Sequence, residues 1–435
     1  MGGKIDLLQQ SRKRELQIDI DHHYASKVYT TGSPITGTAT FTPRKDTPFE
    51  TLRISLAGLA RVRRDDLDYP KIATHWFLRT DMSDAELVYP GSKVFRARES
   101  YTIPFHFIVP DRLTTNACNH KVDVGYVRSH HLCLPPSMGT WSKDDMSVAS
   151  ARVEYGIQVD IVTPSSKKGQ NNTISNKHII NVIPYAAEEP PLNIMPLNIQ
   201  YNMQKDKKIR KSLISPVDGR LTAVASQPRA VNLDADGQSA SESTVHINLE
   251  FKAKGPGVCP PKIGTVSATL QAQTWSRQSP SLNFPNMGLL RDAYTNYTTI
   301  LSKVPVEGSW ETEPEDKETG ADSTSHSATV QVPFSLPMAK RLWIPTFHNC
   351  LISRTYRMEV ALEVGNTTLR FNVPVQIAME SLDFPLEAEV DGWTPDDFGV
   401  MEHAWPGWTG RYSYGDYGPR ALRAVGGDVL PGYSA

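Results

Sequence analysis

Histidine and cysteine are the side chains of this sequence whose chemistry could hold a transition metal. Four cysteines stand far apart and form no CxxC pair: Cys118, Cys133, Cys259 and Cys350. That spacing is typical of neither a disulfide framework nor a zinc site. In the pairs His22-His23 and His130-His131, neighbours on a strand would point to opposite faces, so each pair offers one inward ligand at best. No carboxylate or cysteine cluster completes a site, and we expect no bound metal and no cofactor.

The sequence also lacks the short motifs that mark common catalytic sites. GxSxG, the phosphate-binding GxxxxGK with Ser or Thr, HExxH and a dinucleotide fingerprint after a strand are all missing. Acidic pairs occur at Asp65-Asp66 and Asp396-Asp397. Adjacent residues in expected loops do not place a proton donor and a proton acceptor across a substrate. We therefore expect no catalytic residues and a protein that is not an enzyme.

The densest basic segment is a candidate binding patch with these cations: Lys205, Lys207, Lys208, Arg210 and Lys211. As a positive patch it would contact acidic segments of a partner protein, or anionic lipid at about 1 kcal/mol per basic residue. The alternative is an exposed or edge strand that its lysines keep soluble, which is the commoner case. Sequence alone leaves both interpretations open.

Length and charge narrow the class of protein. The chain has 435 residues, which is enough for two or three domains. Its 46 Lys and Arg residues nearly balance its 47 Asp and Glu residues, which argues against a surface built for nucleic acid. No run of about 18 apolar residues is present, and the start lacks the pattern of a secretory signal. We therefore expect a cytoplasmic protein.

Alternation of apolar and polar residues predicts the elements that would position these side chains. The alternation is strongest over Ala151–Ile161, Val245–Ala253 and Tyr356–Val364, which indicates half-buried antiparallel strands. Weaker strands are expected at further segments: Leu16–Ile20, Ile35–Phe41, Thr51–Leu56, Tyr101–Val109, Ile179–Ile183, Thr265–Thr274, Thr329–Leu336 and Leu369–Ile377. Frequent prolines leave little room for long helices, and one helix is expected, around Met287–Leu301.

The spacing of these strands predicts the domain organisation. Short strands separated by Pro, Gly and Asn are typical of β-sandwiches. Strand signals stop after Ile183, and the acidic, Pro-containing segment Ala186–Leu192 is typical of a linker. We expect an all-β fold of two tandem antiparallel immunoglobulin-like β-sandwiches over residues 1–185 and 199–381, with a linker at 186–198. Residues 382–435, rich in Gly, Trp and Tyr, are expected to form a flexible tail.

Several segments resemble, in order, the strands of an arrestin N-domain: Leu16–Ile20, Val28–Gly37, Leu52–Ala60, Tyr101–Pro110, Leu134–Ser137 and Val153–Val159. Val332–Leu336, Ile344–Thr346 and Ile352–Val364 resemble the closing strands of the arrestin C-domain. The resemblance covers about residues 14–380, and the chain is similar to the fungal α-arrestins, the arrestin-related trafficking adaptors.

That resemblance implies a non-catalytic adaptor at the plasma membrane or endosomes. Such an adaptor binds plasma-membrane transporters or receptors and recruits a WW-domain HECT-type ubiquitin ligase, which marks the cargo for endocytosis. Leu430-Pro431-Gly432-Tyr433 matches the LPxY variant of the family's PPxY signal, in which proline and tyrosine fill adjacent parts of a WW groove. Leu430 lacks the fixed φ of proline and Gly432 loosens the segment, so a weak ligand is expected.

Two other functions remain as alternatives. A ligase-independent, retromer-like sorting scaffold of arrestin fold has no use for a WW ligand, so the motif at Leu430–Tyr433 separates it from the adaptor. A β-sandwich hydrolase or carbohydrate-binding module would need a secretory signal, and usually an aromatic platform with paired carboxylates. The missing signal favours the adaptor.

Overall fold

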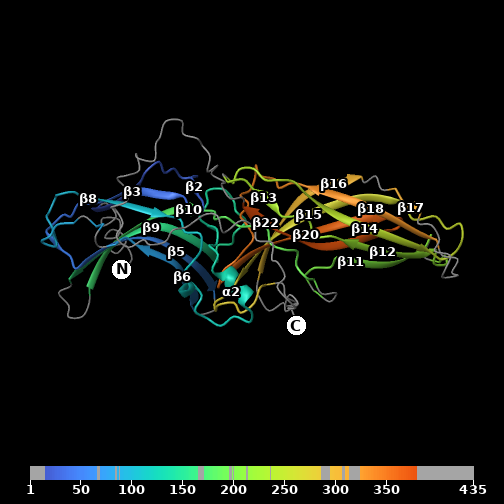
Figure 1. Cartoon of the computed structure of the whole chain (residues 1–435), viewed down its shortest axis with the longest axis horizontal. Coiled ribbons are helices and arrows are strands. Elements are labelled where there is room, and N and C mark those ends of the chain that lie inside the picture. The colour runs from blue at the N-terminus through green and yellow to red at the C-terminus, as the bar shows by residue number, and fades with distance from the viewer. Residues whose placement is uncertain are drawn as a thin grey trace, which may run out of the picture. The chain divides into compact units, whose positions relative to one another are not determined.

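The chain divides into a compact unit, Met1–Ser381, and a second unit, Leu382–Ala435. The computed structural model describes only residues of the first unit: 15–65, 69–83, 86–87, 89–164, 171–194, 198, 200–211, 214–235, 237–285, 294–305, 309–312 and 324–379. In these ranges the chain is mostly β-strand, arranged in several antiparallel sheets (Figure 1). No helix among these residues is long and apolar enough to cross a membrane.

The first half of the described chain, up to Ile183, forms two larger sheets and one two-stranded sheet. A three-stranded antiparallel sheet contains β1 (Leu16–Ile20), β3 (Pro34–Phe41) and β8 (Tyr101–Ile108). A five-stranded sheet has the order β2 (Val28–Tyr29), β10 (Asn171–Val182), β9 (Ala151–Pro164), β5 (Thr51–Asp65) and β6 (Pro70–Asp81). Its strands pair antiparallel except β2, which runs parallel to β10. The short strands β4 (Thr47–Pro48) and β7 (Val94–Phe95) pair with each other.

The second half has two five-stranded sheets of its own. One has the order β11 (Gln204–Ile209), β12 (Gly219–Ala225), β14 (Ser243–Ala253), β18 (Ser325–Phe334) and β17 (Glu311–Thr312). The other has the order β16 (Tyr294–Pro305), β15 (Ile263–Ser276), β20 (Ile352–Val364) and β19 (Phe347–His348), with β21 (Thr367–Val375) also paired to β20. β13 (Val231–Leu233) and β22 (Ile377–Met379) form a parallel pair.

The period-two alternation becomes a regular alternation of burial in β14. Val245, Ile247, Leu249 and Phe251 are buried, and the residues between them are exposed or half-buried. Burying one such aliphatic or aromatic side chain contributes about 1.5–3 kcal/mol to folding stability. The alternating sequence therefore favours a strand with one face in a hydrophobic core. The predicted predominance of β-strands in antiparallel sheets is confirmed for the described residues.

Two features of the secondary structure differ from expectation. The helix expected around Met287–Leu301 is wrong from Tyr294 onward, where the chain forms β16. Its Tyr, Thr and Ile residues favour an extended backbone, because β-branched and aromatic side chains lose freedom in a helix. A short α-helix that the sequence did not predict, α2 (Gly125–His131), follows the 3-10 turn η1 (Thr115–Ala117). With no side-chain cap at Val124, α2 lacks the usual sequence mark of a helix start.

Two hydrophobic clusters fill the two halves, and each takes residues from the other half. The first cluster contains side chains of β1, β3, β5, β8, β9 and β10, together with these from the second half: Leu342, Ile344, Phe347, Leu351 and Ile352. The second cluster contains side chains of β12, β14, β15, β18, β20 and β21, together with Met146 and Ile183 from the first half. The segment around Met146 and the segment from Leu342 to Ile352 therefore join the halves through buried contacts.

Candidate functional site

The expected WW ligand lies outside the described residues. Leu430, Pro431, Gly432 and Tyr433 belong to the second unit, of which the structure describes no residue. Their role therefore stays a prediction from the sequence.

The basic segment lies on an edge strand, and its lysines alternate between the two faces of the sheet. Lys205 and Lys207 stand opposite Ala223 and Leu221 of β12, whose side chains are buried, so both lysines lie on the core side. Burial, and then the charge of Lys207, lowers the pKa of Lys205. Lys205 is half-buried, whereas Lys207 is exposed at the edge of the sheet. Charges on the inner face of an edge strand oppose pairing with a further strand. Lys205 and Lys207 thus fit the edge-strand interpretation.

Lys208 lies on the opposite, outer face, where it begins a row of cations. It stands directly opposite Arg220 on β12, and Arg220 stands opposite Lys252 on β14. Arg220 forms an ion pair of 3.4 Å with Asp206, and Lys252 one of 2.8 Å with Glu250. Like charges directly opposite each other destabilise a sheet, and these carboxylates offset part of that repulsion. The sequence did not reveal this row, because its members are separated by 12 and 32 residues along the chain.

Arg210 and Lys211 follow β11 and are exposed. Arg210 donates from Nη1 to the main-chain oxygen of Ser215, 3.5 Å away, and the main-chain oxygen of Lys211 accepts from Nδ2 of Asn366 at 3.1 Å. The five cations of the segment therefore do not form one surface. Lys208, Arg220 and Lys252, which we call the outer-face row, are the cations that the sheet brings together.

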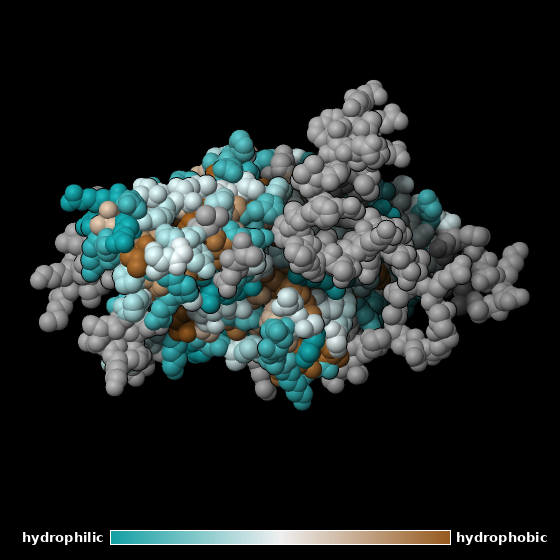
Figure 2. Space-filling view, turned by 60° about the vertical axis from the view of Figure 1, so that its left-hand side comes forward, coloured by the Kyte–Doolittle hydropathy of each residue, from teal (hydrophilic) through white to brown (hydrophobic). Residues whose placement is uncertain are grey.

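Among the residues that the structure describes, the exposed apolar side chains do not identify a second binding surface. On the face that Figure 2 displays, hydrophobic residues are interspersed with hydrophilic ones. Ile72 and Trp76 on the edge strand β6 are among the exposed large apolar residues. Single exposed apolar residues are normal on a protein surface and identify no partner.

A buried arginine lies where the two halves meet. Arg354 on β20 is fully buried, and its Nη2 donates to the main-chain oxygen of Met146 at 3.2 Å. Met146 has a positive φ of 57°, which costs energy for a residue other than glycine. The N–H of Met146 is held by Oδ1 of Asp144 at 2.9 Å, so that side-chain contacts fix the strained turn from both sides.

Further polar contacts tie the same turn to the second half. Lys143 donates from Nζ to the main-chain oxygen of Met338 at 2.5 Å, and the N–H of Leu342 donates to the main-chain oxygen of Asp144 at 2.9 Å. Arg341 pairs with the carboxylate of Asp144. The turn is therefore a structural joint between the halves.

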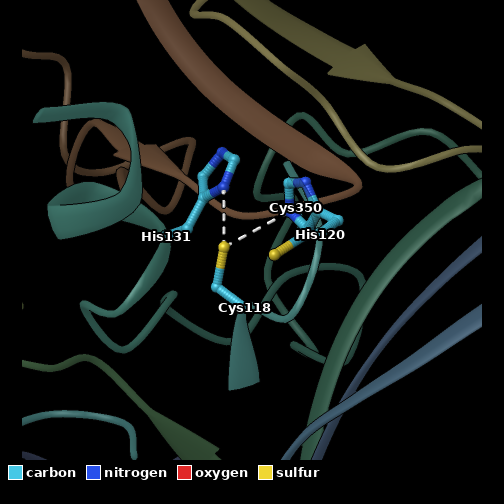
Figure 3. Close-up of side chains that lie close together, drawn as sticks. All are labelled: Cys118, His120, His131 and Cys350. Atoms are coloured by element: carbon cyan, nitrogen blue, oxygen red, sulfur yellow. Dashed lines mark hydrogen bonds between the residues drawn. The ribbon is translucent and has the colours of Figure 1, made fainter. Parts of the chain in front are cut away.

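Near this joint, a cluster of two cysteines and two histidines gathers from three segments (Figure 3). Cys118 directly follows η1, His120 comes two residues later, and His131 is the last residue of α2. Cys350 lies in the turn between β19 and β20. Among the described residues, these are the side chains whose potential metal-binding atoms come together, all within 4.8 Å of one another.

The centre of this Cys–His cluster is Sγ of Cys118. It lies 3.4 Å from Nε2 of His120 and 3.6 Å from Nδ1 of His131. Cys118, His131 and Cys350 are buried, and His120 is half-buried. Burial, with His120 and other histidines nearby, lowers the pKa of His131 to about 4. Burial, with Cys118 beside it, raises the pKa of the Cys350 thiol to about 12.

Reasoning from spacing did not find this cluster. Cys118, His120 and His131 stand close together in the sequence, but Cys350 comes from the other half of the chain. The strand geometry expected for His130-His131 is wrong, because these residues lie on α2. The short spacing from Cys118 to His131 was the one available signal.

Comparison of the sequence with models of protein families found no match, and comparison with curated proteins found none either. The fold and the sites define a mostly β-strand protein of antiparallel sheets that carries a buried Cys–His cluster and an outer-face row of cations.

Proposed function

We propose that this protein is a non-catalytic trafficking adaptor of arrestin fold. Its two tandem antiparallel β-sandwiches would be of the immunoglobulin-like type, with residues 382–435 as a tail. The observation that carries the proposal is the pair of hydrophobic clusters, each lined by strands of two sheets, in the order along the chain that the arrestin resemblance implies. The joint around Met146 and Arg354 would hold the two sandwiches as one scaffold.

In this proposal the outer-face row binds an acidic cytosolic segment of a plasma-membrane transporter or receptor. The cations of Lys208, Arg220 and Lys252 lie across three adjacent strands. An acidic segment laid over the row would relieve the repulsion between its neighbouring charges, and opposite charge also speeds the encounter of partners. Anionic lipid offers the same charge, so peripheral binding at the plasma membrane or endosomes is the competing use of this row.

The proposal also includes recruitment of a WW-domain HECT-type ubiquitin ligase by Pro431 and Tyr433. A WW groove binds short segments in the polyproline II conformation, and Pro431 presets φ for it. Tyr433 would supply a large apolar surface with a polar tip. Because Leu430 and Gly432 weaken the ligand, we expect a single-site dissociation constant on the order of tens of micromolar or weaker. Binding to several WW domains at once would lower the apparent dissociation constant.

A titration of a peptide of residues 426–435 against a panel of WW domains tests the ligase step. We expect the Tyr433→Ala peptide to lose binding and the Leu430→Pro peptide to bind more tightly. The same pair of variants in the full chain should change capture of the ligase in parallel while leaving the unfolding temperature unchanged. Equal binding of the Tyr433→Ala and unchanged peptides would contradict ligase recruitment and favour the ligase-independent, retromer-like sorting scaffold.

A further inference from the structure

The Cys–His cluster has the ligand set of a tetrahedral zinc site. Two thiol sulfurs and two imidazole nitrogens are the donors that structural zinc sites use, and a tetrahedral arrangement of this set favours zinc over calcium or magnesium, which take oxygen ligands. We propose that Cys118, His120, His131 and Cys350 bind one zinc ion that joins the two halves of the chain. This proposal goes beyond the trafficking function and does not depend on it.

The distances around Cys118 agree with such a site. With Zn–S of about 2.3 Å and Zn–N of about 2.0–2.1 Å, a tetrahedral ion holds sulfur and nitrogen ligands about 3.6 Å apart. The two measured separations from Sγ of Cys118 are 3.4 Å to His120 and 3.6 Å to His131. The greatest separation among the four ligand atoms is within 4.8 Å. Closing that pair onto one ion requires a shift of about 1 Å, which side-chain rotation can supply.

The tautomer of His120 is set for metal binding. Its Nδ1 lies 2.8 Å from the main-chain oxygen of Lys121. A carbonyl oxygen only accepts, so Nδ1 carries the hydrogen, and Nε2 of the neutral ring keeps its lone pair toward Cys118. A hydrogen bond from the far ring nitrogen to a carbonyl is the usual way in which proteins orient a metal-binding histidine. This contact distinguishes the cluster from four side chains that merely pack together.

The surroundings also fit a structural rather than a catalytic ion. Cys118, His131 and Cys350 are almost inaccessible to solvent, and four protein ligands leave no open position for a substrate. Three ligands come from the segment 118–131, and the fourth comes from the turn at Cys350. Leu351 and Ile352, directly after Cys350, pack in the first hydrophobic cluster. An ion here would fasten the second half of the chain to the first at a point where their cores already meet.

Metal content of the full-length protein, purified without added metal or chelator, is the first test. We expect about one zinc ion per chain. Cys350→Ser and His131→Ala should lose the zinc, whereas Cys133→Ser and Cys259→Ser, which alter the exposed free cysteines, should retain it. Zinc that is absent from the unchanged protein, or is equally present in the Cys350→Ser variant, would overturn the proposal.

A second measurement keeps the proposal testable if a variant folds poorly. Reduced, metal-depleted full-length protein is titrated with Co²⁺ alone. We expect saturation at one ion per chain, with the intense visible bands of tetrahedral Co²⁺ and the thiolate charge-transfer band in the near ultraviolet. Zn²⁺ should displace both, and zinc binding should raise the unfolding temperature of the unchanged protein, because an ion that binds only the folded state stabilises it. Octahedral Co²⁺ spectra, or a Cys118–Cys350 disulfide in protein purified under reducing conditions, would contradict the site.

Discussion

The guanidinium of Arg354 donates from Nη1 to the main-chain oxygen of Asp145, 3.0 Å away, although the two residues lie in different halves of the chain. The carboxylate of Asp145 accepts from the N–H of Gly139 at 2.6 Å and from the N–H of Ser147 at 3.0 Å. Main chain and side chain of Asp145 therefore serve separate partners. Loss of Arg354 would remove the hydrogen bonds that tie the main chain of Asp145 and Met146 to β20, while the contacts of the Asp145 carboxylate would remain.

Arg354→Leu is expected to destabilise the protein by about 3 kcal/mol, because two buried main-chain oxygens, of Asp145 and Met146, lose their donor. The matched control is Arg370→Leu on β21. Arg370 forms an ion pair of 3.2 Å with Glu359, and its side chain is 67% exposed. An exposed pair of this kind contributes under about 1 kcal/mol. Urea denaturation of both variants measures the difference, and equal losses would show that Arg354 does not hold the joint.

The strands illustrate which parts of this fold a sequence can predict. In β14, alternation survives in the structure because one face is buried and the other meets water. At the start of β20, residues 352–356 are all buried, so no alternation marks them, and Arg354 lies among them. Sequence patterning depends on contrast between two faces, and it loses information where both are covered.

The sites were less predictable than the strands, for a related reason. The basic segment could be recognised because five cations lie within seven residues, but the pleat of β11 places Lys207 and Lys208 on opposite faces. The outer-face row and the Cys–His cluster each combine residues from distant segments. Such groupings arise from strand register and from contacts between the two halves of the chain. The spacing of residues along the sequence predicts neither of them.

Alkaline pH is expected to weaken the fold through Tyr155 and Tyr356. Burial raises the pKa of both phenols above the usual value, well above it for Tyr155. The hydroxyl of Tyr155 donates to the main-chain oxygen of Pro135 at 2.6 Å, and that of Tyr356 donates to the main-chain oxygen of Ile344 at 2.7 Å. Both phenols thus stay protonated in the folded state at pH values where those of the unfolded chain ionise.

Because the pKa of each phenol is higher in the folded state than in the unfolded state, the folded state loses stability as the pH rises. Below about pH 10 neither state ionises these groups and their contribution is complete; above it the unfolded chain releases protons and stability falls by up to about 1.4 kcal/mol per pH unit for each tyrosine. Urea midpoints measured from pH 8 to pH 11 should decline more steeply above pH 10 for the unchanged protein than for a Tyr155→Phe, Tyr356→Phe double variant. If the urea midpoints of the unchanged protein and the double variant decline in parallel above pH 10, the two tyrosines are not the cause of the alkaline loss of stability.

The adjacent lysines of β11 offer a matched pair for testing where an acidic partner binds. Lys208 belongs to the outer-face row, whereas Lys207 lies on the core side of the same strand. If an acidic segment binds the row, Lys208→Gln should weaken binding of an acidic peptide by about 1 kcal/mol, or about fivefold in dissociation constant.

Lys207→Gln removes the same charge one residue away and should leave that affinity unchanged. The titration is made at two salt concentrations, because screening of exposed charges should weaken binding to the unchanged protein and reduce the difference between it and the Lys208→Gln variant. Vesicles containing anionic lipid serve as the second probe, and stronger binding to them than to the peptide would assign the row to the membrane instead. Equal losses for the two lysines would contradict a role for the outer face, because total charge alone would then explain the binding.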